Sequence, residues 1–237
     1  GVLGIYMRLL HMGIRMNHKK IRRLMRKYGL YCPVRKANPY RRMAKAMRTN
    51  AVADNLLKRE FRLRGPRKVF LTDITYIPFN DSFLYLSVIM DSFTDEVLSY
   101  VLSESLEVDF VLQTVKQFIA KHGTTLDSEA IIHSDQGCHY TSTSFRAIVS
   151  DYGLRQSMSR RGNCWDNAPQ ESFFGHMKQE IQFKTRKCLS FSAVQEAIDD
   201  WIDYYNKDRY KAALNNLSPN EFYKYITTGE YPLKMLH

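Results

Sequence analysis

Short apolar runs alternate with turn residues through the middle of the chain. Runs of this kind, rich in Val, Ile, Leu and aromatic residues, predict β-strands. The strands are expected at residues 68–79, 83–90, 97–102, 130–134 and 154–158. Short turns join the first three, which predicts consecutive strands paired as hairpins.

In the segments before and between the last two predicted strands, apolar residues recur at the spacing of a helix and not of a strand. Helices that pack one apolar face on a sheet show this spacing, and they are expected at residues 108–122 and 142–152. Hairpin strands followed by strand–helix alternation predict an α/β fold, with a mixed five-stranded sheet and helices on its faces.

A further helix is predicted to begin after residues 160–165. Because proline is tolerated in the first turn of a helix, Pro169 places the start near Asp166 or Asn167, either of which can act as the N-cap. Asn167 and Glu171 fall on one face of this helix. The neighbouring apolar stripe, expected to pack on the sheet, consists of Phe173, Met177 and Ile181.

The C-terminal segment contains two capping-box patterns, in which a Ser is followed three residues later by Gln or Glu. Ser192 with Gln195 begins one predicted helix, and Ser218 with Glu221 begins a shorter one. The apolar face of the first helix is predicted to be Val194, Ile198, Trp201, Ile202 and Tyr205. We interpret both helices as packing elements.

The N-terminal residues predict two helices joined by a short turn. Residues 2–12 are mostly apolar and end at Gly13, and a second helix runs from Asn17 as N-cap to Gly29 as its stop. Its apolar face is predicted to be Ile21, Leu24, Met25 and Tyr28. Its basic positions are Lys19, Lys20, Arg22, Arg23, Arg26 and Lys27. This arrangement is typical of a helix-turn-helix domain, whose second helix enters the major groove of DNA.

Charge divides the chain into two parts. Residues 1–68 contain 20 of the 35 Lys and Arg residues and only two acidic residues, so their net charge is +18. Residues 69–237 carry a net charge of −7. This asymmetry predicts a nucleic-acid-binding arm on a catalytic body. Most of the basic residues are expected to contact phosphates, which give affinity without sequence information.

With 237 residues, of which 44% are hydrophobic, the chain is long enough for two globular domains. We predict a basic helix-turn-helix-like DNA-binding domain at 1–48, a basic linker at 49–66 and a catalytic domain with C-terminal helices at 67–237. A short helix is considered for residues 49–61. Because the chain opens with Gly1 and not with Met, we interpret it as a segment of a longer product, with the first domain cut short at its start.

Neither cysteines nor apolar runs indicate another class of protein. The four cysteines are scattered without a C-x-x-C pair, which is typical of incidental thiols in a reducing compartment. No apolar run approaches the roughly 20 residues of a membrane span, and no signal peptide is visible.

Three acidic residues combine into a candidate catalytic centre. Asp73 lies within a predicted strand, Asp135 follows another, and Glu171 lies on the predicted helix, with 35 residues between it and Asp135. Asp91 also ends a strand, but the turn that follows accounts for it. His133 shares a strand face with Asp135. It is either a buried residue that supports the site or a metal ligand. Asn167 is also expected to support the site.

Asp73, Asp135 and Glu171, in this order and with this final gap, resemble the acidic triad of transposases and retroviral integrases. The flanking sequences are more specific. Residues 72–75, 133–137 and 162–168, and residues 171–174 with Lys178, resemble the bacterial insertion sequence three family, and the similarity extends over nearly the whole chain.

The resemblance implies a ribonuclease H-like core and a transposase that cuts and joins DNA. Carboxylates repel phosphate, but they can hold two divalent ions roughly 3.5–4 Å apart that activate the attacking oxygen and stabilise the leaving one. Hard oxygen ligands favour Mg²⁺ or Mn²⁺. We expect Asp73 to bridge both ions and Asp135 and Glu171 to complete one site each. Lys178, Arg160 and Arg161 are expected to contact DNA.

The resemblance also implies partners. Such enzymes cut the ends of an element, join them through a circular intermediate and insert the circle into target DNA. They assemble as homo-oligomers on double-stranded DNA, and an upstream reading frame commonly supplies a further helix-turn-helix region. We therefore expect a bacterial cytoplasmic protein associated with the nucleoid and not with a membrane.

Two other functions remain as alternatives. A metal nuclease of the same fold would cleave without joining, and an inactive relic would only bind DNA. The 35-residue gap and the 162–168 motif favour the transposase over the nuclease, and the complete triad favours it over the relic.

Overall fold

The computed structural model describes residues 1–31, 52–58, 60–62, 64–160 and 164–233. The chain forms two compact units, one consisting of Ala37–Trp201 and the other combining Gly1–Lys36 with Ile202–His237. The sequence predicts one domain over residues 67–237, whereas the compact units group the C-terminal residues with the N-terminal ones. The boundary predicted at residue 48 lies outside the described residues and stays a prediction.

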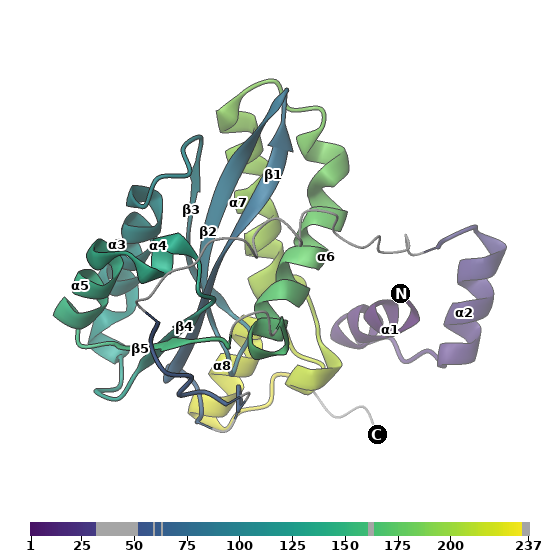
Figure 1. Ribbon diagram of the computed structural model, residues 1–237. Helices are drawn as coiled ribbons and strands as arrows, with labels where there is room; N and C mark the ends of the chain where they lie inside the picture. The colour runs from purple at the N-terminus through teal and green to yellow at the C-terminus, as the bar shows by residue number, and fades with distance from the viewer. Residues whose placement is uncertain (32–51, 59, 63, 161–163, 234–237) are drawn as a thin grey trace. The chain divides into compact units, whose positions relative to one another are not determined.

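The Ala37–Trp201 unit is built on one five-stranded sheet (Figure 1). Its strands are β1 (Val69–Phe79), β2 (Ser82–Asp91), β3 (Val97–Ser103), β4 (Ile131–Ser134) and β5 (Arg155–Met158). The order is β3-β2-β1-β4-β5, with antiparallel pairing from β3 to β1 and parallel pairing from β1 to β5. The predicted mixed sheet is confirmed, and every predicted strand end is within one residue of the observed end.

Helices cover both faces of this sheet. They are α3 (Asp109–His122), α4 (Cys138–Thr141), α5 (Thr143–Asp151), α6 (Ala168–Thr185) and α7 (Phe191–Asp208), with short 3₁₀ turns η2 (Gly123–Thr125) and η3 (Cys164–Asn167). Figure 1 shows α3 and α5 on one side of the sheet and α6 on the other. The two helices predicted at residues 108–122 and 142–152 are therefore confirmed.

Alternation along the strands supplies an apolar core for each face. Phe70 and Ile132 of neighbouring strands pack with Phe118 of α3 and Phe145 of α5, and the Phe70 and Phe118 ring centroids lie 4.7 Å apart. On the other side the predicted stripe of α6 is buried: Phe173, Met177 and Ile181. Helix α6 is thereby fixed against the sheet over most of its length.

The Asp91 carboxylate organises the turn between β2 and β3. Its Oδ1 accepts hydrogen bonds from the backbone N–H groups of Phe93 (2.7 Å) and Thr94 (3.0 Å), and its Oδ2 accepts one from Arg67 N–H (2.6 Å). The residue is fully buried. The interpretation of Asp91 as a structural turn residue is supported by these contacts.

Part of the predicted linker lies along the edge strand β5. Met158 N–H donates to the Asp54 carbonyl at 3.3 Å, and Leu56 N–H donates to Ser157 Oγ at 2.9 Å. Leu57 is fully buried. The helix considered for residues 49–61 is absent from residues 52–58 and 60–61, because their backbone groups bond to β5 and to local turns instead.

The other unit contains α1 (Val2–His11), α2 (His18–Lys27), the 3₁₀ turn η4 (Ala212–Leu214) and α8 (Pro219–Thr228). As predicted, Asn17 Oδ1 caps α2 by accepting from Lys19 N–H at 2.8 Å, and Gly29 ends it with a φ of +64°. Ile21 is buried, but Tyr28 is 65% exposed, so its assignment to the apolar face is wrong. It lies at the C-cap, where the helical spacing no longer directs its side chain inward.

Contacts within this unit join α1 to the C-terminal residues. Arg8 Nη1 donates to Asp208 Oδ1 at 2.7 Å, and the His11 ring stacks on Tyr210 with centroids 3.4 Å apart. The capping box predicted for Ser218 and Glu221 is present at the start of α8.

The predicted start of α7 needs a correction. The helix begins at Phe191, and Ser190 Oγ accepts the Ala193 N–H at 3.2 Å, so Ser190 and not Ser192 provides the cap. The predicted apolar face of α7 is buried throughout: Val194, Ile198, Trp201, Ile202 and Tyr205.

Among the described residues, no helix combines the length and the apolar character that a membrane span needs.

Candidate active site

The sheet register brings two of the three candidate carboxylates together. In the parallel pairing of β1 with β4, Leu71 lies opposite His133. Asp73 and Asp135 each lie two residues further along, so they are neighbours at the end of β4. Asp73 lies in the middle of β1, and Asp135 is the first residue after β4.

Helix α6 supplies the third carboxylate. Glu171 lies in its first turn, and Pro169 occupies an early position, as predicted. Asn167 is the N-cap by position, but its side chain makes no capping hydrogen bond. Its Nδ2 lies 3.5 Å from Asp73 Oδ2, at the limit of a hydrogen bond, so Asn167 faces the acidic site.

Burial and mutual repulsion dominate the electrostatics. Burial raises the pKa of Asp73 well above its usual value, the Asp135 charge and then the Glu171 charge raise it further, and a hydrogen bond from Ile74 N–H opposes the shift. Burial also raises the pKa of Asp135. Asp73 therefore lies close enough to Asp135 and Glu171 for both charges to disfavour its ionised form.

Gly137 lets its own backbone reach Asp135. The Gly137 N–H donates to Asp135 Oδ1 at 2.8 Å, a bond that opposes the rise in the pKa of Asp135. A Cβ at position 137 would lie only 2.9 Å from that oxygen. A side chain would therefore displace the carboxylate.

Lys178, two helical turns beyond Glu171, is a cation beside this group. Burial lowers the pKa of Lys178, and the Asp73 charge opposes that shift. The Lys178 charge in turn lowers the pKa of Asp73, but this effect is smaller than the effects of burial and of the acidic neighbours. Lys178 is thus placed to attract an anion that approaches Asp73.

The donor set fits divalent cations shared between pairs of carboxylates. No three His, Cys, Asp or Glu side chains among the described residues are grouped tightly enough to enclose one ion. A bridging arrangement requires only two protein carboxylates per ion, since Mg²⁺ retains several waters and binds substrate phosphates. Hard carboxylate oxygen atoms are the ligands that such an ion prefers.

His133 is a buried residue with protein partners on both ring nitrogens. Nδ1 lies 2.8 Å from Ser157 Oγ, and Nε2 lies 3.1 Å from Ser159 Oγ and 3.0 Å from the Asp166 carbonyl oxygen. Burial lowers the pKa of His133 to about 4, so the ring is neutral at physiological pH. Of the two open interpretations, these contacts favour the supporting residue over the metal ligand.

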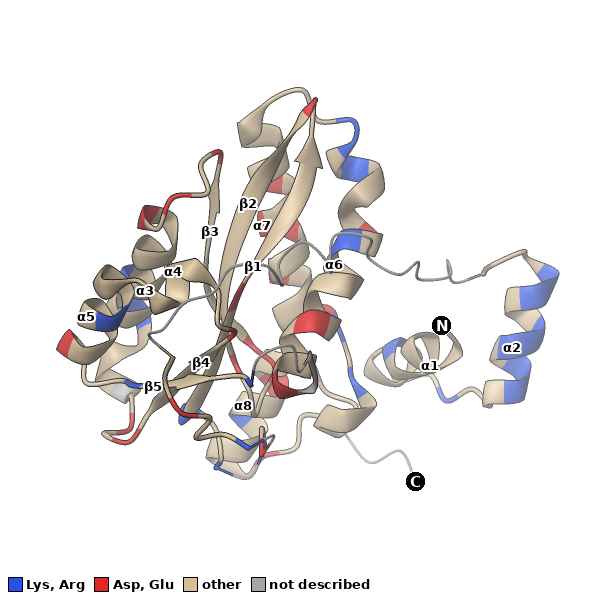
Figure 2. Cartoon of the chain, viewed as in Figure 1, with Lys and Arg blue, Asp and Glu red and all other residues tan. Residues whose placement is uncertain are grey.

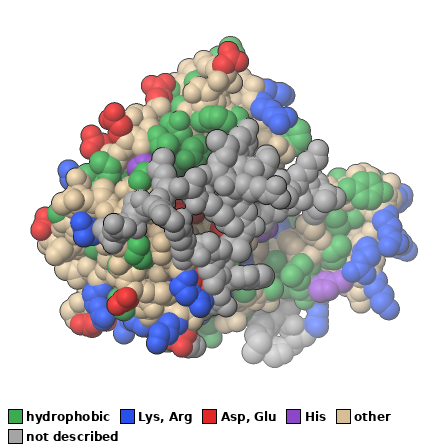
Figure 3. Space-filling model, in the orientation of Figure 1, with side chains coloured by type: hydrophobic (Ala, Val, Ile, Leu, Met, Phe, Trp, Pro, Cys, Tyr) green, Lys and Arg blue, Asp and Glu red, His purple; other side chains and the backbone are tan. Residues whose placement is uncertain are grey.

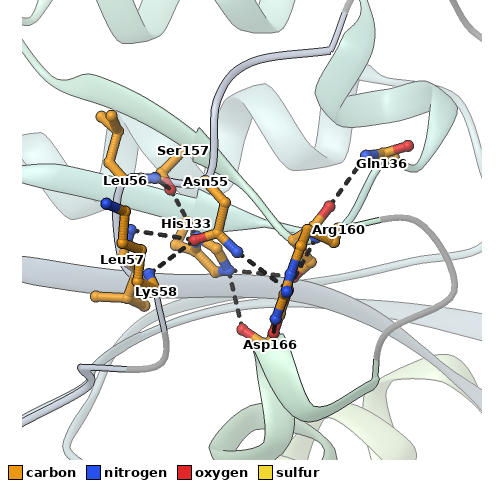
Figure 4. Close-up of polar contacts among 10 residues, drawn as sticks. Asn55, Leu56, Leu57, Lys58, His133, Gln136, Ser157, Arg160 and Asp166 are labelled. Atoms are coloured by element: carbon orange, nitrogen blue, oxygen red, sulfur yellow. Dashed lines mark hydrogen bonds and ion pairs between the residues drawn. The ribbon is translucent and has the colours of Figure 1, made fainter.

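Asp166 is not the N-cap of α6, although the sequence allows either Asp166 or Asn167 at that position. Its carboxylate is held by Arg160 and Asn55, as Figure 4 shows. It is 1% exposed, whereas the Arg160 side chain is 60% exposed. The contacts described for the Arg160 side chain thus go to Asp166, and a DNA contact by Arg160 stays a prediction. Arg161 lies outside the described residues.

The basic residues of α2 lie on the surface of their own unit. The exposed positions are Lys19, Lys20, Arg22, Arg23, Arg26 and Lys27. Figure 2 shows them along the helix, and Figure 3 shows Lys and Arg gathered on this surface. The structure thus confirms their exposure, and their binding to DNA stays a prediction.

Comparison with known protein families identifies the parts of the chain. Residues 64–164 and residues 152–219 match two models of an integrase core domain, and residues 1–38 match an HTH-like domain. The fold and the acidic site thus define the class of protein, an integrase core of the ribonuclease H-like type with a helix-turn-helix-like region.

Relatives show the family. An uncharacterized transposase-like protein of Haemophilus influenzae is 36% identical over 208 residues, covering 87% of this chain and 92% of that protein. The transposase for insertion sequence element IS904 of Lactococcus lactis is 33% identical over 231 residues, covering 95% and 87%. Transposase InsF for IS3A of Escherichia coli is 28% identical over 212 residues, covering 89% and 72%. The chain belongs to the insertion sequence three family of DNA transposases.

Solved structures agree on the fold. A chain of the simian T-cell lymphotropic virus intasome matches with a TM-score of 0.56 at 17% identity, covering 88% of this chain and 67% of that chain. The catalytic core domain of BIV integrase matches with a TM-score of 0.54 at 17% identity, covering 70% and 99%. The predicted integrase-like core is confirmed.

Sequence reasoning misses the polar residues that surround His133 and Asp166. Asn55 lies far from the motifs in sequence, and Ser157 lies in a predicted strand, where nothing in the pattern marks either residue. It misses Gln170 as well, which is fully buried and whose amide atoms have no hydrogen-bond partner among the described residues. Gln170 directly precedes Glu171, which is the one indication that the sequence offers.

We expect Asp73→Asn to stabilise the protein in metal-free buffer at pH 7. Because the pKa of Asp73 is raised in the folded state, its ionisation costs stability once the pH exceeds the ordinary value of an aspartate. An uncharged residue of equal size removes that cost. The free energy of unfolding, measured with urea in EDTA, should rise by about 1 kcal/mol or more.

Asp151→Asn is the matched control, since Asp151 is exposed at the end of α5. Its effect should stay within about 0.5 kcal/mol. A lower stability of Asp73→Asn would contradict the view that this carboxylate is held under repulsion.

Proposed function

We propose that this transposase cleaves and joins DNA strands with divalent cations held by Asp73, Asp135 and Glu171. The observation that carries the proposal is the placement of the three carboxylates: the register of β1 and β4 makes Asp73 and Asp135 neighbours, and Glu171 lies in the first turn of α6. The raised pKa of Asp73, caused by burial and by the charges of the other two carboxylates, agrees with this placement. A protein stabilises such a group of like charges by binding a cation. A purely structural ion pair between Asp73 and Lys178 is disfavoured, because the Lys178 charge offsets only part of the negative charge around Asp73.

The three residues take different roles in the proposal. The charges of both Asp135 and Glu171 act on Asp73, so Asp73 would be a ligand of both ions. Asp135 and Glu171 would each be a ligand of one ion. Asn167 Nδ2, 3.5 Å from Asp73 Oδ2, would orient the shared carboxylate. Lys178 would bind a phosphate oxygen next to the bond that is cut, since its charge already interacts with that of Asp73.

The ions supply charge neutralisation at phosphorus and a more acidic attacking oxygen. Mg²⁺ or Mn²⁺, two per site, suits the all-carboxylate donor set. A related fold supports this choice: the catalytic core domain of HTLV-2 integrase, solved in complex with magnesium, matches with a TM-score of 0.51 at 16% identity, covering 67% of this chain and 97% of that chain.

The substrate would be double-stranded DNA, at the element ends and at the target. The basic face of α2 would bind phosphates or enter a major groove, in keeping with the HTH-like match over residues 1–38. The enzyme would act as a homo-oligomer on two DNA ends, with an upstream-frame helix-turn-helix region as a further partner. Its site of action would be the bacterial nucleoid in the cytoplasm.

A strand-transfer assay tests the catalytic assignment. Pre-cut element-end DNA, a target plasmid and Mg²⁺ should give joined product with the parent protein. Asp135→Asn and Glu171→Gln should each lower the rate by more than about 100-fold, because removing a ligand has a larger effect than the 10–100-fold typical of residues that only support one. Chelation with EDTA should abolish the reaction.

Asp151→Asn serves as the control and should keep the parent rate. Equal product from the parent and Asp135→Asn would refute the triad assignment. Cleavage without joining would instead identify a nuclease, and DNA binding without chemistry would identify a relic.

The role of α2 is tested by the salt dependence of DNA binding. The double variant Arg22→Gln/Arg26→Gln should reduce the slope of log K against log salt by about 0.9 for each phosphate that is no longer neutralised. Affinity should fall to a similar extent for element-end and unrelated DNA if these arginines bind phosphates only. Fluorescence anisotropy over a range of salt concentrations measures both quantities.

Lys116→Gln/Lys121→Gln removes the same charge from exposed positions on α3. This control should leave the slope near the parent value. An equal decrease in both double variants would show that net charge, and not α2, determines DNA affinity.

A further inference from the structure

Asp166 has a saturated carboxylate next to the start of α6. Its Oδ2 accepts from Arg160 N–H (3.0 Å), Arg160 Nε (2.9 Å) and Asn55 Nδ2 (3.0 Å), and its Oδ1 accepts from Arg160 Nη2 (3.0 Å). Both carboxylate oxygens of Asp166 accept hydrogen bonds from protein donors. The contacts of the Asp166 carboxylate thus hold the chain in place around it.

The backbone of Asp166 is held as firmly as its side chain. Its carbonyl oxygen can only accept, so His133 must carry its proton on Nε2, 3.0 Å away. Nδ1 then accepts from the Ser157 hydroxyl at 2.8 Å, and Ser157 Oγ accepts from Leu56 N–H at 2.9 Å. His133 thereby links Ser157 of β5 to the backbone of Asp166.

These bonds connect the two elements that carry Asp135 and Glu171. His133 lies on β4, two residues before Asp135, and Asp166 lies in η3, immediately before α6. Figure 4 shows His133, Asp166 and Arg160 converging with Asn55 and Ser157. The end of β4 and the start of α6 are thereby joined by hydrogen bonds, in addition to apolar packing.

We propose that Asp166 is a positioning residue for catalysis: with Arg160, Asn55 and His133 it fixes the first turn of α6, and thereby the place of Glu171 relative to Asp73 and Asp135. This role rests on the proposed function, because it concerns the geometry of the carboxylates that would hold the cations. Arg160 acts here within the protein, with a bidentate ion pair to a buried partner.

Asp166→Asn tests the role with little change of volume. The amide places an N–H donor against the Arg160 donors, which breaks the bidentate pair. The strand-transfer rate at saturating DNA should fall between about 10- and 100-fold, the usual effect of residues that orient metal ligands. The Kd for element-end DNA should stay within about twofold, because the substitution leaves the basic face of α2 unchanged. Arg160→Gln should lower the strand-transfer rate at saturating DNA to a similar extent, and the double variant should be little slower than either single variant, because both substitutions remove one interaction.

A second measurement does not depend on activity. Mn²⁺ should raise the Tm of the DNA-free parent protein, and the Mn²⁺ concentration at half of the maximal shift should increase about tenfold or more in Asp166→Asn. Asp91→Asn is the matched control, since Asp91 is also a buried turn carboxylate that accepts backbone N–H groups and pairs with an arginine. It should lower the Tm but leave the Mn²⁺ midpoint unchanged.

The outcomes separate this role from the proposed function. An unchanged rate and Mn²⁺ midpoint in Asp166→Asn, or an equal change in Asp91→Asn, would overturn the positioning role while an active parent keeps the function. A parent without strand transfer, but with an Mn²⁺ shift that Asp166→Asn weakens, would overturn the function and keep the positioning role. The absence of an Mn²⁺ shift in the parent would contradict both.

Discussion

Repulsion between closely placed carboxylates is the constraint on which the catalytic half of this protein depends. Asp73 of β1 and Asp135, which directly follows β4, each lie two residues beyond the paired residues Leu71 and His133, and Glu171 adds a third negative charge from α6. Left to themselves, these groups would move apart or take up protons. The structure keeps them together because each belongs to an element that is fixed by other interactions.

A comparison of the buried acids shows what distinguishes the site. Asp91 and Asp166 are almost completely buried, but backbone N–H groups and an arginine satisfy both of them. Asp73 accepts a backbone N–H and lies near a lysine, which leaves its charge poorly compensated. Burial alone therefore does not mark a catalytic carboxylate. The shortage of compensating donors at Asp73 supports the proposal that a cation binds there.

Most of the architecture can be predicted from the sequence, because its determinants are local. Apolar alternation predicts β1 to β5 to within one residue, and Asn17 and Gly29 mark the ends of α2. Motif spacing predicts the triad, and parallel register explains why Asp73 and Asp135 meet.

Local patterns cannot reveal partners that are distant in the sequence. Asp166 has the side chain of a helix cap and stands in the right place for one, yet Asn55 and Arg160 hold it. Ser190 and Ser192 are equally suitable caps by residue type, and only the path of the chain decides between them.

Crystals of the full chain with element-end DNA and Mn²⁺ provide the most direct test of the central claim. Anomalous diffraction should place two ions at the Asp73 carboxylate, one shared with Asp135 and one shared with Glu171. Ions located away from Asp73, in crystals whose protein joins DNA when redissolved, would contradict the account.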